Sequence, residues 1–505
     1  MPQTPYSVKI KTSLGQTAVP GTGPAHFQVL FKGRIPFFLG LGPDPAILQD
    51  LYPGQAGYFL ECPEMENQMD QQWREKIPAR FIRKDSDFLS SPEAQNLEIV
   101  FYQPGLRYFP EFWARILALL RLGQGSARSG SRTTGHVLMF GDQQALLVPE
   151  ICWELEQKGF KPVLLPERPD PVLLTDVVKR LHPDLAISVN LKGLDPWGQG
   201  PAILSAMDIP LAIWFVDNPF LLLSRLKSHY WKKAFIFVTD HWFIKPLMDH
   251  GALNVFHLPL AAGPGFFQPG RKRINELEKK IVFVGRTSFP GHKSFFAGAS
   301  LDKTSWARAG QLMLSGQRPD FSWWLNRSGA GSLWPGHQAR PAGLGADQIG
   351  LAWKTACLQT LADNYPLAVY GDRNWKKLLP CSADIRPEVD YYGPLASIYA
   401  SAAVCLNLTN MLLPYGLTQR HFDVWAAGGF LITDYTPGLE IFPEELIREV
   451  SFRTPETLGQ VIDHFSSRPQ LKGEITEALY QLIRTEHTYA QRIQTILECV
   501  NSPCK

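Results

Sequence analysis

The chain has 505 residues, and its 50 Lys and Arg against 47 Asp and Glu give a formal net charge of +3. At roughly 150 residues per domain, this length predicts about three domains. The balanced charge, with no long run of one sign, argues against bulk attraction to nucleic acid or anionic lipid. The apolar fraction of 45% excludes wholesale disorder.

No targeting or membrane segment is recognisable in the sequence. The first residues lack the apolar run of about 7–15 residues that a signal peptide needs. The longest apolar stretch, 209–223, is interrupted by Asp217, Asn218 and Pro219 and is shorter than the ~20 residues that span a bilayer. The 7 cysteines include no C-x-x-C pair, as is usual in a reducing compartment. We therefore expect a cytoplasmic protein without a transmembrane segment.

Residues 1–122 mix short apolar runs with an amphipathic stretch at 110–122, which predicts a small α/β domain of unknown role. A polar segment rich in Gly, Ser and Arg follows at 123–135 and is typical of a flexible linker, because it offers nothing to bury. We place a domain boundary there.

Short apolar runs and helix-length stretches then alternate over 136–262. Continuous apolar strands of this kind are typical of a parallel sheet that is covered on both faces. The predicted strands are 136–140, 161–165, 184–189, 210–216, 234–238 and 254–258.

The same alternation restarts at 280 and continues to about 484, after which a C-terminal helix is expected within 485–505. Helices are predicted near 456–466 and 472–499. A long segment at about 286–350, rich in Gly and Trp, is interpreted as an insertion of loops with one or two helices. The predicted strands are 280–285, 366–371, 389–393, 402–408 and 429–434. The fold class is therefore α/β, with two tandem Rossmann-like domains after a small N-terminal α/β domain.

Common nucleotide and metal motifs are missing from the sequence. There is no G-x-x-x-x-G-K-[ST], and the run Gly40-Leu41-Gly42-Pro43-Asp44-Pro45 lacks the third glycine of a dinucleotide fingerprint. No H-E-x-x-H or other tight histidine cluster is present. We expect neither a P-loop enzyme nor a bound metal.

The most informative segment is 405–434. A strand is expected to end near 408, Thr418 to cap a helix that runs to about 426, and Gly428 and Gly429 to end it. Arg420 and Asp423 can share one helix face. A cation near a helix N-terminus suits the phosphates of a nucleoside diphosphate. A carboxylate one turn further along the helix can accept hydrogen bonds from the two ribose hydroxyls. The alternative is an ion pair on a solvated helix.

The same segment reads R-H-F-D-V-W-A-A-G-G-F-L-I-T-D from Arg420 to Asp434, and E-H-T-Y-A-Q-R follows at 486–492. These motifs resemble R-x-F-E-x-x-A-x-G-G-F-L-L-T-D and E-H-T-Y-x-x-R of the CgeB family, within the two-Rossmann GT-B glycosyltransferases. The resemblance covers about 280–500 and, more loosely, 136–260. It implies a glycosyltransferase that uses a nucleotide-diphospho-sugar.

The resemblance also implies roles for individual residues. Arg420 would face the diphosphate, and Asp423, in place of the family's glutamate, would hold the ribose. Tyr415 stands where related retaining enzymes carry a second glutamate, so that sugar contact is absent or differently made. Tyr392 would lie at a strand end and hold the base, unless it is a core aromatic. The donor-binding set comprises Gly285, Arg286, Tyr392, Gly393, Asn407, Thr418, Arg420, Asp423, Gly428 and Gly429.

On the acceptor side, Asp217 and His241 each follow a predicted strand of the first Rossmann-like domain. Ligands of open α/β sheets bind at the carboxyl ends of the strands. Both residues are therefore candidate catalytic bases, Asp217 as the first and His241 as the second. The alternatives are an Asx turn before Pro219 for Asp217 and a structural role for His241.

We expect a UDP-sugar as donor, a protein or glycan as acceptor, no cofactor, and domain closure about a hinge near 263–280. Two other functions stay open. One is a sugar-nucleotide epimerase of the same architecture. The other is a non-catalytic glycan-binding or assembly protein on a degenerate scaffold, which the Tyr415 and Asp423 departures favour.

Overall fold

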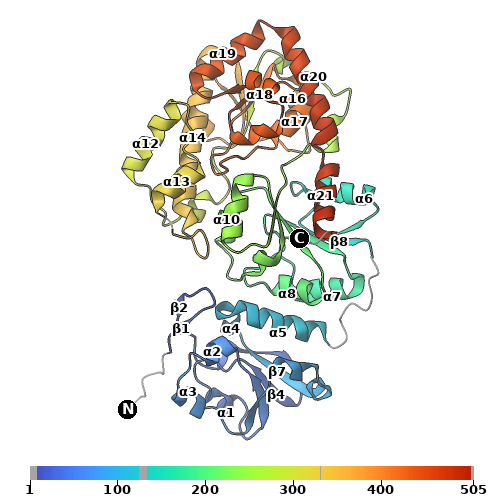
Figure 1. Ribbon diagram of the computed structural model, residues 1–505, viewed down its shortest axis with the longest axis vertical. Helices are drawn as coiled ribbons and strands as arrows, with labels where there is room; N and C mark the ends of the chain where they lie inside the picture. The colour runs from blue at the N-terminus through green and yellow to red at the C-terminus, as the bar shows by residue number, and fades with distance from the viewer. Residues whose placement is uncertain (1–7, 124–133, 330, 502–505) are drawn as a thin grey trace.

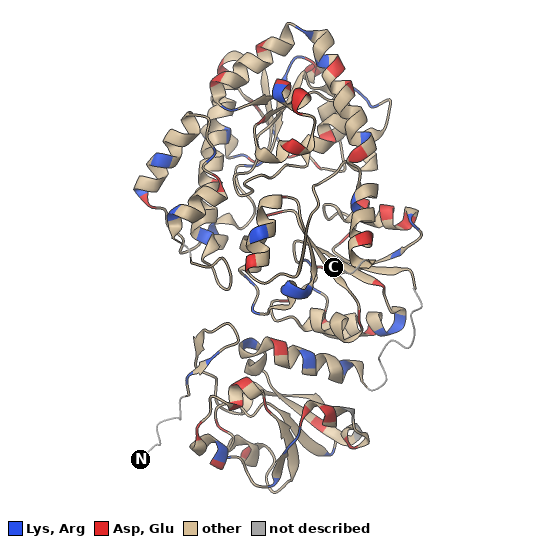
Figure 2. Cartoon of the chain, in the orientation of Figure 1, with Lys and Arg blue, Asp and Glu red and all other residues tan. Residues whose placement is uncertain are grey.

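The computed structural model describes residues 8–123, 134–329 and 331–501, so most of the predicted linker at 123–135 lies outside the described residues. Three α/β units follow one another along its long axis, with the N-terminal unit at the bottom of Figure 1 and the last sheet at the top. Basic and acidic residues are interspersed over all three units (Figure 2), as the small net charge suggests.

The N-terminal unit holds a five-stranded mixed sheet and a short two-stranded one. Its elements are β1 (Ile10–Lys11), β2 (Thr17–Ala18), β3 (Phe27–Phe31), β4 (Ile35–Leu39), α1 (Ile47–Leu51), β5 (Gly57–Leu60), α2 (Pro63–Glu66), α3 (Gln71–Glu75), β6 (Phe81–Arg83), β7 (Leu97–Tyr102), α4 (Pro104–Tyr108) and α5 (Pro110–Leu122). The strand order is β3-β7-β4-β5-β6, with β3 antiparallel and the others parallel. Its core is separate, but α5 also packs Ala118 and Leu122 into the next unit.

The first of the two large sheets has six parallel strands in the order β13-β12-β11-β10-β8-β9. Its elements are β8 (His136–Phe140), α6 (Val148–Gln157), β9 (Lys161–Leu165), α7 (Pro171–Leu181), β10 (Leu185–Val189), α8 (Gln199–Ala206), β11 (Leu211–Phe215), α9 (Pro219–Leu223), β12 (Phe235–Val238), α10 (Ile244–Asp249) and β13 (Asn254–His257). All six predicted strands are confirmed. The strand order reverses between β8 and β10, where ligands of such sheets usually bind.

The second large sheet is also parallel, in the order β16-β15-β14-β17-β18-β19. Its elements up to the last strand are β14 (Ile281–Val284), α11 (His292–Phe295), α12 (Lys303–Leu314), α13 (Phe321–Ser328), α14 (Ala339–Asn364), β15 (Leu367–Tyr370), α15 (Trp375–Leu378), β16 (Asp384–Arg386), α16 (Leu395–Ser401), β17 (Val404–Asn407), α17 (Arg420–Ala426), β18 (Leu431–Asp434), α18 (Glu444–Val450) and β19 (Ser451–Phe452). The predicted fold class, α/β with two tandem Rossmann-like sheets, is confirmed. We call the unit of each large sheet a half.

The predicted strand at 389–393 is wrong. Asp390 begins a turn there, in which its side chain accepts from the N–H of Tyr392 (3.2 Å) and its carbonyl accepts from the N–H of Gly393 (3.2 Å). The strand of this region is β16, which is short and polar and gave no apolar signal.

The interpretation of 286–350 as mostly loops is also wrong, because α11, α12, α13 and the first half of α14 occupy it. These helices pack back onto the first half of the molecule. The indole N–H of Trp334 donates to the carbonyl of Leu223 (3.1 Å), and the Phe321 ring contacts the rings of Trp242 and Phe243. The insertion therefore joins the two halves.

Three helices close the chain: α19 (Pro455–Ser466), α20 (Pro469–Glu486) and α21 (Tyr489–Asn501). The predicted stretch at 472–499 is broken at His487, and α21 returns to pack against α6 of the first half (Figure 1). Arg492 holds this crossing, because its Nε donates to the carbonyl of Pro259 (2.8 Å). The domain boundaries given above remain predictions.

No helix among the described residues combines the length and the apolar character needed to cross a bilayer.

Glu61 is the most deeply buried acid of the N-terminal unit, with 2% of its surface exposed. Its two carboxylate oxygens accept from the N–H groups of Leu41 (2.7 Å) and Cys62 (2.8 Å) at the carboxyl ends of β4 and β5. Burial outweighs these hydrogen bonds and raises the pKa of Glu61 to about 7. The carboxyl is therefore protonated at mildly acidic pH.

We expect the N-terminal unit to lose up to about 3 kcal/mol of stability as the pH rises from 4.5 through 7. The folded state holds the proton of Glu61 more tightly than the unfolded chain, so this stabilisation is complete at low pH and is lost on ionisation. Hydrogen exchange of β4 and β5 at pH 5 and pH 8, after correction for the intrinsic rate, measures it. Glu61→Gln should abolish the pH dependence, whereas the exposed Glu93→Gln should keep it.

Candidate functional site

The carboxyl ends of the two large sheets meet in the middle of the molecule. Asn218, after β11, donates its amide to the carbonyl of Leu412 (2.9 Å), which follows β17. Asp240, after β12, accepts from the N–H of Tyr415 (2.9 Å). The loop 408–417 of the second half is thus tied to the first half at two points.

Beside this junction lies a cavity of about 480 Å³ between the halves. It opens between helix α6 of the first half, the connecting segment 263–271, and the turn that leads into α16. Its lining comprises Pro149, Glu150, Trp153, Gly263, Pro264, Gly265, Phe266, Gln268, Arg271, Tyr391, Tyr392, Gly393, Ala396 and Ser397.

Tyr392 and Gly393 line this cavity from a turn, and not from the strand end at which they were predicted. The Tyr392 side chain is 43% exposed, so its alternative role as a core aromatic is wrong. Its hydroxyl donates to Oε2 of Glu150 (3.0 Å) across the boundary between the halves. Burial raises the pKa of Glu150 above its ordinary value.

Asp423 lies on α17 behind this cavity and is 1% exposed. It forms no ion pair with Arg420 although the structure describes both, so the solvated ion pair is wrong. Its Oδ1 accepts from the amide of Gln419 (2.9 Å), and burial raises its pKa well above the ordinary value. Tyr391 stands beside its carboxylate and lines the cavity, whereas Asp423 is not part of the lining. A ribose in the cavity therefore meets Tyr391 before Asp423.

The Tyr391 hydroxyl is buried beside the Asp423 carboxylate, and this contact lowers the pKa of Asp423 against the larger effect of burial. The contact is not a well-oriented hydrogen bond, which buried hydroxyls usually have. Hydroxyl groups of a ligand could therefore replace it.

Arg420 is held at the point where the strand order of the second sheet reverses, between β14 and β17. Its Nε donates to Oδ1 of Asn407 (2.7 Å) and its Nη1 to the carbonyl of Val284 (2.9 Å). Burial lowers its pKa, but arginine stays charged in proteins. The guanidinium is thus a fixed cation at the edge where this sheet would bind a ligand.

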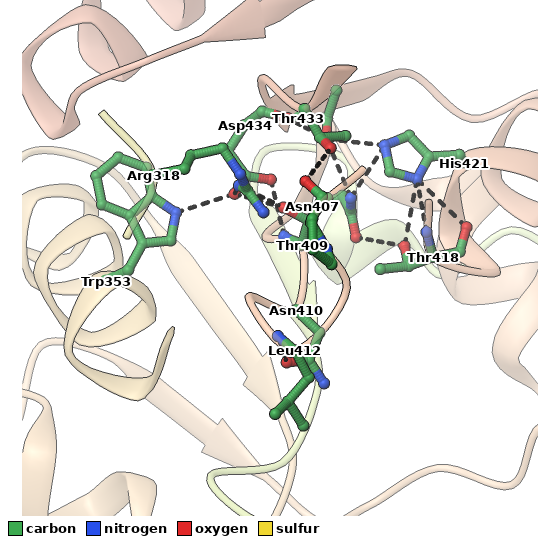
Figure 3. Close-up of polar contacts among 12 residues, drawn as sticks. Arg318, Trp353, Asn407, Thr409, Asn410, Leu412, Thr418, His421, Thr433 and Asp434 are labelled. Atoms are coloured by element: carbon green, nitrogen blue, oxygen red, sulfur yellow. Dashed lines mark hydrogen bonds and ion pairs between the residues drawn. The ribbon is translucent and has the colours of Figure 1, made fainter. Parts of the chain in front are cut away.

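Asn407 supports Arg420 and is itself held by Thr418. Figure 3 shows the contacts of Asn407 with Thr418 and Thr433. The Thr418 hydroxyl donates to the same Oδ1 of Asn407 (2.8 Å), and the Asn407 amide donates to Thr433 (3.0 Å). Thr418 was predicted to cap α17, which is wrong: the helix begins at Arg420 and has no side-chain cap. Asn407 is fully buried, so it positions Arg420 and does not line the cavity.

Gly285 and Arg286 follow β14 as predicted. Gly285 accepts from the indole N–H of Trp375 (2.8 Å), and the exposed Arg286 pairs with Glu388 (3.1 Å). Neither lines the cavity.

Lys354 on α14 is a cation that sequence reasoning missed. Its ammonium has no hydrogen bond or ion pair to any residue in the described part of the chain. Burial, and then the charge of Arg420, lower its pKa. A lone lysine in a helical stretch gives no sequence signal, and only the fold brings it near Arg420.

Gly428 and Gly429 end α17, as predicted, through hydrogen bonds from their N–H groups to the carbonyls of Trp425 (2.9 Å) and Val424 (2.9 Å). Gly428 has a φ of 72°, which glycine adopts without strain. They precede β18 and so lie at the amino edge of a parallel sheet, opposite the cavity. Their assignment to the donor site is therefore wrong.

In the first half, Asp217 accepts from the amide of Asn190 (2.8 Å), which follows β10. Its side chain keeps contact with solvent, while the protein around it raises its pKa by desolvation. The Asx contact at the start of α9 comes from Asn218, whose Oδ1 accepts from the N–H of Phe220 (3.1 Å). Asp217 is thus free of the turn and can face a ligand.

His241 lies where the two halves touch. Its Nε2 is 3.3 Å from Oε1 of Glu440, and its ring contacts those of Tyr415 and His257. Burial lowers the pKa of His257 to about 4. Tyr415, where related retaining enzymes carry glutamate, therefore faces a histidine.

No group of three or more His, Cys, Asp or Glu side chains in the described ranges is arranged to hold a metal ion.

Residues 354–498 match the model of a family described as glycosyl transferase-like. The match begins at Lys354 and includes the turn at Tyr392, Arg420 and Asp423.

Two solved structures are similar to this chain. One is Anabaena HepE in complex with UDP-glucose, with a TM-score of 0.44 and 11% identity over 72% of this chain and 99% of that one. The other is T4 phage BGT in complex with its UDP-glucose substrate, with a TM-score of 0.42 and 11% identity over 72% of this chain and 98% of that one. The comparison with curated proteins found no match.

We expect Asn407→Ala to destabilise the second half by about 1–3 kcal/mol, because Nε of Arg420 and the hydroxyl of Thr418 both lose a buried acceptor. Thermal unfolding measures the loss. Asn364→Ala is the matched control, since its amide contacts only an exposed helical carbonyl. Equal melting temperatures for the two variants would contradict the supporting role of Asn407.

Proposed function

We propose that the protein is a glycosyltransferase that binds a nucleotide-diphospho-sugar in its second half. The observation that carries the proposal is the pair of cations at the strand reversal of that half. Arg420 is fixed by Asn407 and Val284, and Lys354 lacks any described partner. Neither cation forms an ion pair with a described carboxylate, and the more distant charges of Asp347, Asp423 and Asp434 offset burial only in part, because the pKa of each cation stays lowered. An added anion would complete their neutralisation. A diphosphate supplies that charge.

The rest of the donor extends from the diphosphate into the cavity. The ribose hydroxyls would take the place of the Tyr391 hydroxyl beside Asp423 and satisfy both groups. The base would then lie against Tyr392 and Gly393. The match of residues 354–498 to a glycosyl transferase-like family supports the assignment of this half to a transferase.

Transfer requires that an acceptor oxygen attacks the anomeric carbon while the bond from that carbon to the diphosphate oxygen breaks. In an inverting enzyme, the proton of the acceptor hydroxyl passes to a base of the first half. His241 is our first candidate, because Glu440 lies within contact of its ring and can stabilise the imidazolium that forms. Asp217 is the second, since its raised pKa improves it as a base. The acceptor, a protein or a glycan, would enter from this side.

Arg420 and Lys354 would stabilise the leaving diphosphate, which supports a transferase that needs neither a metal ion nor another cofactor.

A non-catalytic glycan-binding role is the second candidate, and the burial of Asp423 behind Tyr391 favours it. Release of free diphosphate from a sugar donor by the purified protein separates the two, because a binding protein releases none.

Lys354→Ala should weaken binding of a nucleoside diphosphate at least tenfold, because one charge-assisted contact of about 1.5–3 kcal/mol is lost. Titration calorimetry with UDP, GDP, dTDP and CDP measures it. Lys377→Ala, on the exposed face of α15, is the control and should bind as the wild type does. The donor site is wrong if the wild type binds none of the four.

His241→Asn should lower the release of free nucleoside diphosphate from the sugar donor by about 100-fold or more, because water loses its base. His464→Asn, a half-exposed histidine on α19, is the matched control. If His241→Asn keeps the wild-type rate and Asp217→Asn loses it, the catalytic base is Asp217 and not His241.

A further inference from the structure

The cavity between the halves has one wall that belongs to the first half. Helix α6 contributes Glu150 and Trp153, which lie three residues apart and so share one helix face. The connecting segment contributes Phe266 and Arg271. A molecule in this cavity therefore touches residues that lie outside the glycosyl transferase-like match at 354–498.

The aromatic side chains of the cavity offer flat surfaces to a ring. Trp153 and Tyr392 are each 43% exposed, although large aromatic side chains are usually buried. They come from opposite halves of the molecule. Stacking of a base on an aromatic side chain is worth about 1–3 kcal/mol, so the base of a nucleotide suits the space between them.

Two charged side chains face the same space. Glu150 is the one acid among the lining residues and is 6% exposed. Its Oε2 accepts from Tyr392 (3.0 Å). Arg271 is the one arginine of the lining. Its Nε donates to the carbonyl of Gln268 (3.1 Å) and its Nη2 to that of Gly265, and its Nη1 has no partner among the described residues. An acceptor and a donor are therefore held on one cavity wall.

We propose that Glu150 and Arg271 read the base of the donor and select guanine over uracil. This inference rests on the proposed function, because it takes the nucleotide to occupy the cavity. It makes Glu150, a residue of the first half, a determinant of base specificity. The donor would then be a GDP-sugar, and not the UDP-sugar that the sequence led us to expect.

The chemistry of the two side chains carries the choice. A carboxylate only accepts hydrogen bonds and a guanidinium only donates them. Guanine presents N1–H and an amino group on one edge, which match a carboxylate, and O6 with N7 on the next edge, which match an arginine. Uracil has a single ring N–H between two carbonyl oxygens and no amino group. With uracil bound, the Glu150 carboxylate would accept one hydrogen bond and would face the two carbonyl oxygens of the base.

The test is titration calorimetry with GDP, UDP and inorganic pyrophosphate as probes. We expect the wild-type chain to bind GDP at least tenfold more tightly than UDP. Glu150→Gln should remove that preference and leave pyrophosphate binding unchanged. Glu156→Gln, on the exposed face of the same helix, is the matched control and should keep the preference.

Arg271→Leu is a second variant, which should also lower the GDP preference if Glu150→Gln does not fold. Tighter binding of UDP than of GDP to the wild type overturns the inference, as does an unchanged ratio in folded Glu150→Gln. Pyrophosphate binding distinguishes the two proposals. If it persists while GDP is not preferred, only the base assignment fails. If neither pyrophosphate nor any nucleotide binds, the donor site fails as well.

Discussion

The hydrogen bond from Arg420 to Asn407 is the contact on which the arrangement of the second half depends. A guanidinium enclosed by protein must have its donors satisfied, because an unpaired buried charge costs several kcal/mol. Asn407 meets one donor and Val284 meets another, so the bond links β14, β17 and α17 at a single point. The same amide oxygen also accepts a hydrogen bond from the Thr418 hydroxyl, which fixes the position of the chain just before α17 begins. A cation is thereby held where the strand order reverses.

This fixed point extends into the first half through the loop that follows β17. Asn218 and Asp240 hold that loop from the opposite sheet, and the insertion adds the contact between Trp334 and Leu223. Arg492 secures the other side, next to the connecting segment. The hinge expected near 263–280 is therefore flanked by contacts on both sides of the cleft. Any domain closure must keep these contacts or exchange them.

Most strands of the two large sheets were predictable from the sequence because they are apolar runs, which a parallel sheet covered on both faces requires. Strands β16 and β19 escaped because they are only three and two residues long and contain polar residues. The insertion was misjudged because its glycines suggest loops, yet Gly343 and Gly345 lie in α14, where a side chain would collide with Leu221 or Trp324. Glycine there serves close packing, which sequence composition does not distinguish from a turn.

The site was only partly predictable. Arg420 and Asp423 belong to one sequence motif, and Tyr392 lies in a short turn with Gly393. A local sequence pattern was therefore enough to identify each of them. Thr418 was misjudged because a hydroxyl before a helix is the usual cap, whereas here Asn407, eleven residues earlier, takes it. Lys354 and Glu150 come from helices far from the motif, and no spacing links them to it. Only the folded chain brings Lys354 near Arg420 and Glu150 to the wall of the cavity.

The titratable groups around the junction of the two halves share one property. Burial disfavours the charged form of each, so the pKa values of Asp217, Glu150 and Asp423 rise and those of Lys354 and Arg420 fall. A bound diphosphate would reverse the effect on the cations, because an adjacent negative charge favours their charged form. Hydroxyl and N–H donors of a nucleoside would do the same for the carboxylates. A ligand with an anionic centre and neutral donors around it would therefore favour the charged forms of both kinds of side chain together.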